Sequence, residues 1–363
     1  MSQATKLSMY LGDTDPEQIF GYFFTSGTTD KPKIVPLKRR QMYFAADASA
    51  ENFKPRPNHF WLLCLPLNHI GGVSIILRSI LYGSGIYRMK RFDKGMVTTF
   101  LSENNLFQAA SLVPTMLKRL LENPVFQTHK NFKAILLGGG SIDSELLELS
   151  IQRGIPLVSS YGMTETCAQI AANPLLQPSG IYRPLKSVGD IFKPNKIEIR
   201  DEHNKKLSAN NSGTIWIKGP QVFDGYLNPE RPNLSFDEGG WFNTGDFGYF
   251  NANGHLFIQS RRTDLIITGG ENVSPFEVES ELEKIEPISE AAVLGLEDKE
   301  WGQQVVAVVV AKTKEKLKAE DIQNQLKSRI TSYKVPKQII QADTLPRTQS
   351  GKVKRTELVK LFK

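Results

Sequence analysis

The chain has 363 residues, of which 40% are hydrophobic and 23% are charged. That length is enough for two domains, and that composition excludes a chain that is disordered throughout. The 45 basic and 38 acidic residues leave a net charge of +7, which suits an anionic ligand but, being modest and spread along the chain, is weak evidence for a nucleic-acid partner.

Short apolar runs that end in glycine or proline alternate with amphipathic segments over most of the chain. Residues 60–65 (FWLLCL), 134–137 (AILL), 157–159 and 214–217 (TIWI) are predicted strands. Glycine-rich loops and then helical patterning follow the first three, which is typical of an α/β domain. Ligands of such domains bind at the loops that follow the strand ends.

The C-terminal part has a different pattern. Residues 264–268 (DLIIT) and 304–311 (QVVAVVVA) are predicted strands, and Ser274, followed by a proline and then by a glutamate three positions after it, marks a helix start. Apolar residues at helical spacing predict two helices, through the residues Val278, Leu282, Ile285, Ile322, Leu326 and Ile330. We therefore expect a small α+β domain, with a boundary near residues 260–264 that divides the chain into domains 1–262 and 263–363.

The sequence FTSGTTDKPK, residues 24–33, places four hydroxyl side chains around one glycine, with two lysines close behind. Hydroxyls and free backbone N–H groups donate hydrogen bonds and the lysines add charge, so this loop suits a polyphosphate. It is not the G-x-x-x-x-G-K-[ST] loop, and Pro32 and Pro36 prevent an immediate helix start. Composition alone leaves a polar surface turn open as the alternative.

Residues 159–166 (SSYGMTET) lie at the end of a predicted strand. Tyr161 could offer an aromatic face to a base, and Thr164 with Glu165 could hold Mg²⁺ and a phosphate oxygen. The alternative is a strand-to-helix turn in which Glu165 is a first-turn acid favoured by the helix dipole.

Four further positions carry weaker signals. Asp246, in a Thr-Gly-Asp turn, could bind both hydroxyls of a ribose or make an Asx turn. Lys352 matters only if it reaches a phosphate, and His69, after an apolar strand, is more often structural than catalytic. The glycines 138–140 could let a planar base lie against bare backbone, or could form a plain turn.

The order and spacing of these motifs resemble the adenylate-forming superfamily of acyl-CoA synthetases, peptide-synthetase adenylation domains and luciferases, from about Phe20 onward. The resemblance implies a large N-terminal α/β domain of adenylate-forming type and a small, mobile α+β C-terminal domain that carries the catalytic lysine. Stretches such as GMTETCAQI, TGDFGYFNANGHLFI and RRTDLIITGGENV are most similar to the o-succinylbenzoate–CoA ligases of menaquinone biosynthesis.

The resemblance also implies a role for each matching residue. Catalysis is assigned to Lys352, Thr164 and Glu165, and Glu165 is also the metal ligand. The residues implied to bind ATP are Thr25, Ser26, Gly27, Thr28, Thr29, Lys33, Gly139, Gly140, Tyr161, Gly162, Asp246 and Arg261. The remaining roles are the acyl pocket for His69, the CoA loop for Gly269, Gly270 and Glu271, and the hinge for Thr263.

The implied reaction is an AMP-forming ligation that uses ATP, Mg²⁺ and coenzyme A. The carboxylate of a small organic acid attacks the α-phosphorus of ATP and expels pyrophosphate, and the CoA thiol then attacks the acyl carbon and releases AMP. A carboxylate is already ionised at neutral pH, so the first step needs positioning and charge neutralisation rather than a general base. The alternatives are a ligase for another aryl or fatty acid, an adenylating enzyme that loads a carrier protein, luciferase-like oxidation, and a basic nucleic-acid or nucleotide-binding module without catalysis.

The sequence departs from the family pattern at several positions. Asp30 and Ile34 stand where the family usually has glycine, and Asp30 adds negative charge near a polyphosphate. Thr263 occupies a hinge position where Asp or Lys is common. Only 24 residues precede Thr25, whereas family members usually carry a long N-terminal segment. We therefore expect a shortened large domain, which a homodimer partner could cover.

The two cysteines, Cys64 and Cys167, belong to no Cys-x-x-Cys or Cys/His cluster. This excludes a disulfide framework and a structural zinc site and fits a reducing compartment. The N-terminal residues lack the apolar core of a secretory signal, and Arg78 and several glycines interrupt the most apolar stretch, residues 71–86. We expect a soluble, cytoplasmic protein without a membrane span.

Overall fold

The computed structural model describes residues 12–25, 33–140, 142, 144–175, 187–227, 235–261, 266–269, 271–313, 316–347 and 353–362. Its contacts divide the chain into two compact units. The first comprises Met1–Thr244 and Tyr249–Ile258, and the second comprises Gly245–Gly248 and Gln259–Lys363. The predicted domain boundary, between residues 262 and 263, lies outside the described residues.

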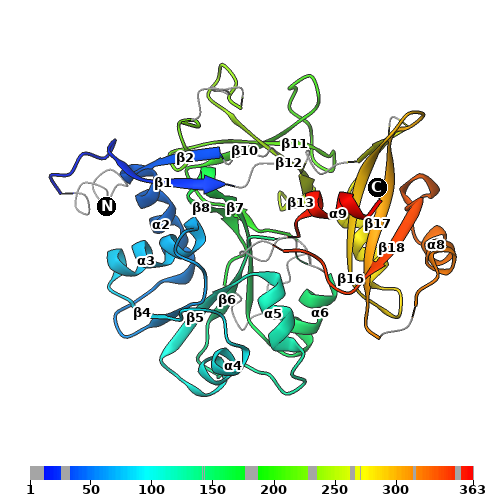
Figure 1. Cartoon of the computed structure of the whole chain (residues 1–363). Helices are drawn as coiled ribbons and strands as arrows, with labels where there is room; N and C mark the ends of the chain where they lie inside the picture. Colours follow the sequence, from blue (N-terminus) through cyan, green and yellow to red (C-terminus); the bar gives the residue numbers. More distant parts are fainter. Residues whose placement is uncertain are drawn as a thin grey trace. The chain divides into compact units, whose positions relative to one another are not determined.

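The first unit is built on a seven-stranded sheet with the strand order β4-β3-β5-β6-β7-β8-β9 (Figure 1). The five strands from β4 to β7 are parallel, and β8 and β9 continue the sheet antiparallel. The strands are β3 (Phe60–Leu63), β4 (Gly85–Arg88), β5 (Phe107–Leu112), β6 (Ala134–Leu137), β7 (Leu157–Met163), β8 (Ala168–Ala172) and β9 (Asp190–Ile191).

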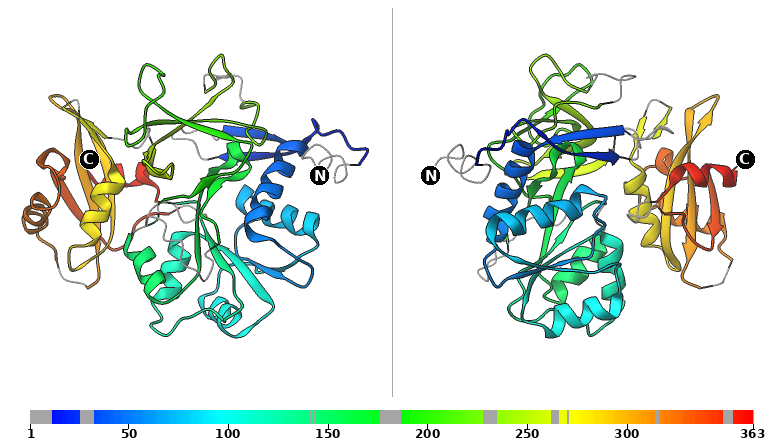
Figure 2. Two further views of the ribbon diagram at one scale, coloured as in Figure 1. Left: turned by 180° about the vertical axis from the view of Figure 1, so that it is seen from behind. Right: turned by 60° about the vertical axis from the view of Figure 1, so that its left-hand side comes forward.

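Helices cover both faces of this sheet, as Figure 2 shows from two further sides. The helices are α2 (Arg39–Phe53), α3 (Ile70–Tyr82), α4 (Lys94–Glu103), α5 (Pro114–Leu121) and α6 (Ser144–Gln152). Successive residues of a strand point to opposite faces, so Leu62 packs with the helices α4 to α6. Its neighbours Trp61 and Leu63 pack instead with Phe53 of α2 and Ile75 of α3.

Two smaller sheets adjoin the antiparallel end. The strands β1 (Ile19–Thr25) and β2 (Lys33–Lys38) form a hairpin, and a second sheet has the order β10-β11-β12-β13. The strands of that sheet are β10 (Lys196–Arg200), β11 (Gly213–Lys218), β12 (Phe242–Phe250) and β13 (Leu256–Arg261). A common core joins the hairpin, β8 and this sheet, and it contains Val35, Tyr161, Ile170 and Ile215.

The second unit has its own sheet, with the order β15-β14-β17-β16 and β18 parallel to β17. Its elements are β14 (Ile266–Thr268), β15 (Glu271–Val273), α7 (Pro275–Glu283), β16 (Ile288–Asp298), β17 (Gly302–Ala311), α8 (Ala319–Lys327), β18 (Gln338–Ala342) and α9 (Arg355–Leu358). The predicted cap is confirmed, because the Ser274 hydroxyl accepts a hydrogen bond from the Glu277 N–H at 3.5 Å. Ile330 was predicted to continue the stripe of α8, but it lies beyond the end of that helix.

The structure corrects two other local predictions. We expected a helix after the strand that starts at Leu157, but β7 runs on to Met163 and a tight turn returns the chain as the antiparallel strand β8. We also expected Asp246 in a tight turn, but it lies inside the nine-residue strand β12. Gly245 has φ +73°, a left-handed conformation that glycine adopts without cost, so the strand passes through a local irregularity.

Both cysteines are free and buried, as expected for a chain without a disulfide framework. Burial raises the pKa of the Cys64 thiol to about 12 and also raises that of Cys167, so neither thiol ionises at neutral pH. Within the described ranges, no helix combines the length and the apolar character that crossing a bilayer requires.

Candidate active site

The carboxyl ends of β6 and β7 bring two predicted segments together. Leu137, the last residue of β6, pairs with Ser159 of β7, and the Ser160 hydroxyl donates to the Leu137 carbonyl at 3.1 Å. Gly139 and Gly140 follow with exposed backbone, and Gly139 has φ +77°. Tyr161 is only 7% exposed, so most of its ring packs in the core. The two glycines therefore expose their backbone next to the end of β7, and their predicted contact with adenine stays a prediction.

A very tight turn presents Thr164 and Glu165. After β7 the chain forms a single 3₁₀ turn, Thr164–Thr166, which the Thr166 hydroxyl closes by bonding to both the N–H and the carbonyl of Met163. A Cβ atom added at Gly162 would lie 1.6 Å from the backbone oxygen of Ala168. Only glycine permits this approach of β7 to β8, so Gly162 is required for the shape of the turn as well as being a predicted ATP contact.

The Glu165 carboxylate is 8% exposed and is held by a residue that the sequence analysis did not identify. The Tyr226 hydroxyl donates a hydrogen bond to Glu165 Oε1 at 2.7 Å. The Phe223 N–H donates to the Glu165 backbone carbonyl at 2.8 Å. In the described part of the chain Glu165 forms no ion pair, so no cation already engages its carboxyl group.

The hairpin β1–β2 brings the ends of the predicted phosphate loop to the same place. Thr25 pairs directly with Lys33, so the intervening loop must begin and end side by side. The Leu227 N–H donates to the Ile34 carbonyl at 3.0 Å, and the Lys33 ammonium lies 4.7 Å from the centre of the Tyr226 ring. Tyr226 therefore links the predicted phosphate lysine to the predicted metal ligand.

The residues present fit Mg²⁺ that arrives with a nucleotide. Among the described residues, no three His, Cys, Asp or Glu side chains are grouped so that they could hold a metal ion. Glu165, with the Thr164 hydroxyl beside it in the same turn, supplies one buried carboxylate. Mg²⁺ in nucleotide enzymes typically binds one or two carboxylates, substrate phosphates and water, so a single glutamate is a sufficient protein ligand.

The predicted acyl residue His69 lies at the start of α3 and is half-buried. The same helix carries Arg78, which the sequence analysis treated only as an interruption of an apolar stretch. Arg78 is 2% exposed and stacks 3.9 Å from the centre of the Trp61 ring, and its Nη1 donates to the Ser49 hydroxyl at 2.6 Å. Its Nε and Nη2 atoms are buried and have no hydrogen-bond partner among the residues that the structure describes. Burial lowers the pKa of Arg78 to about 9, so the guanidinium remains charged at neutral pH.

The remaining predicted residues are distributed as follows. Asp246 is 4% exposed in β12, and Arg261 ends β13. Gly269 forms the β14–β15 turn with φ +59°, and its N–H donates to the Trp301 carbonyl at 2.9 Å, whereas Glu271 is exposed in β15. The predictions that fall outside the described residues are Ser26, Gly27, Thr28, Thr29, Thr263, Gly270 and Lys352.

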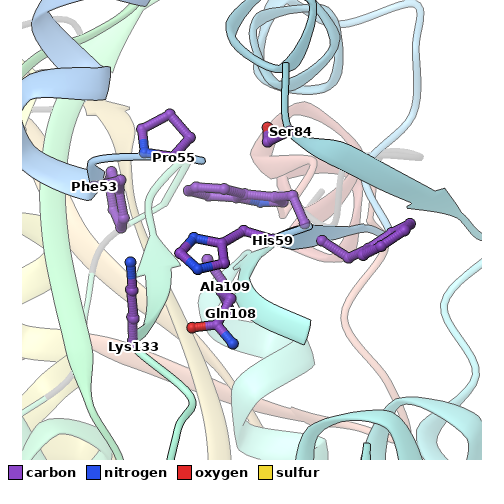
Figure 3. A pocket seen from close by; sticks show the side chains of 9 residues that line it. Phe53, Pro55, His59, Ser84, Gln108, Ala109 and Lys133 are labelled. Atoms are coloured by element: carbon purple, nitrogen blue, oxygen red, sulfur yellow. The ribbon is translucent and has the colours of Figure 1, made fainter. Parts of the chain in front are cut away.

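A small cavity lies at the opposite, amino-terminal edge of the same sheet (Figure 3). It measures about 20 Å³ and is lined by Phe53, His59, Trp61 and Lys133, among others. In Figure 3 the Lys133 side chain extends toward Phe53 and His59. A volume of this size holds about one water molecule, so this cavity is too small for a nucleotide.

Two family matches cover most of the sequence. Residues 4–227 match the AMP-binding enzyme family, and residues 277–352 match the AMP-binding enzyme C-terminal domain. The 2-succinylbenzoate–CoA ligase of Listeria monocytogenes is 39% identical over 335 residues, which are 92% of this chain and 68% of that protein. The ligase of the same name from Bacillus subtilis is 38% identical over 335 residues, which are 92% of this chain and 67% of that protein.

Solved structures agree with these matches. The o-succinylbenzoate CoA synthetase (MenE) of Bacillus subtilis, in complex with the acyl-adenylate intermediate OSB-AMP, has a TM-score of 0.86 and 37% identity over 95% of this chain and 69% of its own. The same synthetase with ATP and a magnesium ion has a TM-score of 0.85 and 36% identity over 95% of this chain and 70% of its own. ATP-bound MatB from Rhodopseudomonas palustris has a TM-score of 0.88 at 28% identity, covering 96% of this chain and 69% of its own. The predicted fold class is therefore confirmed, and the chain belongs to the AMP-binding enzyme family.

Proposed function

We propose that the chain is an AMP-forming acid–CoA ligase whose acid is o-succinylbenzoate. The observation that supports the nucleotide part is the convergence of Lys33 and Glu165 on Tyr226, because a cation suited to a phosphate and a carboxylate suited to a metal ion then lie close together. The choice of acid is supported by the 36–39% identity to 2-succinylbenzoate–CoA ligases over more than nine-tenths of the chain.

In the first step the chain has to bring together two anions, the acid and ATP. Lys33 and the hydroxyl-rich loop would bind the β- and γ-phosphates, and Thr164 would place the α-phosphate. Mg²⁺ held by Glu165 would supply charge neutralisation at the phosphates. Lys352 would donate to both the acid carboxylate and the α-phosphate. These contacts would orient the reactants and stabilise the developing charge, and no general base is needed because the acid is already ionised.

The nucleoside would be held by the other residues of the predicted set. Gly139, Gly140 and Gly162 would form the backbone surface for adenine, next to Tyr161. Asp246, with Arg261, would bind the ribose hydroxyls. The second step would use Gly269, Gly270 and Glu271 for the CoA thiol arm and Thr263 as the hinge.

His69 would serve an acid with two carboxylates. It lies at the start of α3, after the carboxyl end of β3, so its imidazole could donate to the distal carboxylate of o-succinylbenzoate, directly or through water. Arg78 lies near the other end of the same helix, enclosed by Phe53 and Trp61 toward the amino edge, so it is not part of this site.

The experiment that tests the function is pyrophosphate release with ATP and o-succinylbenzoate, followed by mass detection of the CoA thioester. Release with other aryl or fatty acids but not with o-succinylbenzoate would reassign the substrate. Transfer to a phosphopantetheinyl carrier but not to CoA would reassign the acceptor.

We propose a cytoplasmic location, which the two free thiols and the use of ATP and CoA support. A homodimer remains a prediction, and light scattering on the purified chain is its test.

A further inference from the structure

Tyr226 contacts Glu165 and Lys33 in different ways. Its hydroxyl donates to Glu165 Oε1 at 2.7 Å, and the face of its ring lies 4.7 Å from the Lys33 ammonium. The hydroxyl contact uses one carboxylate oxygen, and no described residue bonds to the other, which can therefore bind a metal ion. The ring contact is a cation–π interaction, which holds an ammonium group without neutralising its charge.

The segment that carries Tyr226 is anchored on both sides of the site. The Phe223 N–H bonds to the Glu165 carbonyl and the Leu227 N–H bonds to the Ile34 carbonyl. The Phe223 ring packs edge-on against the Tyr226 ring, with 4.8 Å between the ring centres. These contacts fix the tyrosine between β2 and the 3₁₀ turn, so its position does not depend on a ligand.

Lys33 and Glu165 contact different parts of the same tyrosine. Lys33 and Glu165 both touch Tyr226, yet they form no ion pair with each other, and neither has an ion pair with any other described residue. A direct contact between them would neutralise the two groups on which the binding of phosphate and metal depends. Instead the face of the ring contacts the cation, while the hydroxyl on its rim bonds to the carboxylate.

We propose that Tyr226 is the positioning residue of the nucleotide site: its hydroxyl orients Glu165 for Mg²⁺, and its ring prevents Lys33 from pairing with Glu165. The proposal rests on the proposed function only in taking Mg²⁺ and ATP as the ligands. It assigns separate effects to two parts of one side chain, and two substitutions separate them.

The experiment is calorimetric titration of the full chain with ATP, once with Mg²⁺ and once with EDTA. Tyr226→Phe keeps the ring and removes the hydroxyl. We expect the Mg²⁺ concentration for half-maximal stimulation of ATP binding to rise about 10-fold, as when the partner of a metal ligand is lost. The affinity for metal-free ATP should change less than about 2-fold, because the ring still holds Lys33.

Tyr226→Leu removes the ring as well. Lys33 should then collapse onto Glu165, so that metal-free ATP binds at least about 5-fold more weakly and Mg²⁺ stimulation is nearly lost. If Tyr226→Phe and Tyr226→Leu weakened metal-free ATP binding equally, the spacer role of the ring would be wrong. If Tyr226→Phe left the Mg²⁺ requirement unchanged, the orienting role of the hydroxyl would be wrong.

Two controls separate positioning from folding. Tyr249→Phe removes a tyrosine hydroxyl from β12, where the ring stacks on Phe257, and should change neither titration. In a Glu165→Gln background, Tyr226→Phe should add no further Mg²⁺ effect, and the same 10-fold change there would overturn the proposal. If the wild-type chain bound Mg²⁺ and ATP but formed no thioester, the proposed ligase function would be wrong. The titrations would still test the role of Tyr226, because they measure binding only.

Discussion

The carboxyl and amino edges of the seven-stranded sheet in the first unit differ in the surroundings of their charged side chains. At the carboxyl edge Glu165 is buried, bonded to Tyr226 and kept out of ion pairs in the described structure. At the amino edge the cavity of about 20 Å³ adjoins Lys133 and His59, and burial and neighbouring cations lower the pKa of both. The carboxyl edge therefore presents a carboxyl group that no described cation pairs with, whereas at the amino edge burial and like charges disfavour the charged forms of Lys133 and His59. The difference follows the rule that parallel sheets bind ligands at the carboxyl ends of their strands.

The first prediction asks whether the carboxyl edge is sufficient by itself. Lys352→Ala, in the second unit, should slow adenylate formation about 1,000-fold. A charge pair at 4 Å is worth about 4 kcal/mol at an effective dielectric of 20, and each 1.4 kcal/mol is about tenfold in rate. Thioester formation from supplied acyl-adenylate should be spared, as measured by single-turnover assays of each half-reaction. Equal losses in both half-reactions would remove the role assigned to this lysine.

The second prediction compares the two edges directly. Glu165→Gln should lower pyrophosphate release about 100-fold at moderate Mg²⁺, because the only described carboxylate at the turn is lost. The matched variant Lys133→Met, at the amino edge, should stay within about 2-fold of wild type. Comparable losses in both variants would show that the contrast between the edges has no functional meaning.

The third prediction concerns a buried charge toward the amino edge, where Arg78 packs on Trp61. Arg78→Met should leave the KM for o-succinylbenzoate within about 2-fold of wild type. Stability should stay equal or rise by about 1–4 kcal/mol, because a buried cation without an ion pair in the described structure is replaced by an apolar side chain. Steady-state kinetics and thermal unfolding measure the two effects. A KM that rose about 30-fold or more in Arg78→Met would instead make Arg78 a substrate residue.

The fourth prediction compares one glycine at each edge. Gly162→Ala should destabilise the chain by about 2–3 kcal/mol or more, because its Cβ would lie 1.6 Å from a backbone oxygen. Gly154, in the loop before β7, has φ +65° with nothing within 4 Å, so Gly154→Ala should cost only about 1–2 kcal/mol. Urea unfolding of both variants measures the difference, and equal costs would mean that the turn at the carboxyl edge is not as tight as the structure has it.

The fifth and smallest effect is a pH dependence at the amino edge. Burial, Arg56 and Lys54 lower the pKa of Lys133. The folded state therefore binds this proton more weakly than the unfolded chain, so this group costs stability at neutral pH and the cost disappears as pH rises toward about 10.4. Lys133→Met should raise the unfolding temperature at pH 7 and lose that advantage near pH 10. A variant whose advantage grew with pH would contradict this sign.

The sequence analysis was most successful where local pattern decides structure. Apolar runs predicted β6 and β17, and the cap at Ser274 predicted the start of α7, because these signals come from neighbouring residues. Tyr226 was missed because its partner Glu165 is 61 positions away. The burial of Arg78 could not be predicted, because only the packing of α2, α3 and the sheet shows that the guanidinium is enclosed. Asp246 was placed in a turn because a Gly-Asp pair predicts one locally, whereas sheet pairing keeps β12 extended through it.

The burial of both cysteines has a practical consequence for spectroscopy. Cys64 and Cys167 are buried and un-ionised at neutral pH, so maleimide dyes should not react with them in the folded chain. A single cysteine introduced at an exposed position such as Asn253 then becomes the sole attachment point. Labelled protein can therefore be prepared without first removing the native thiols.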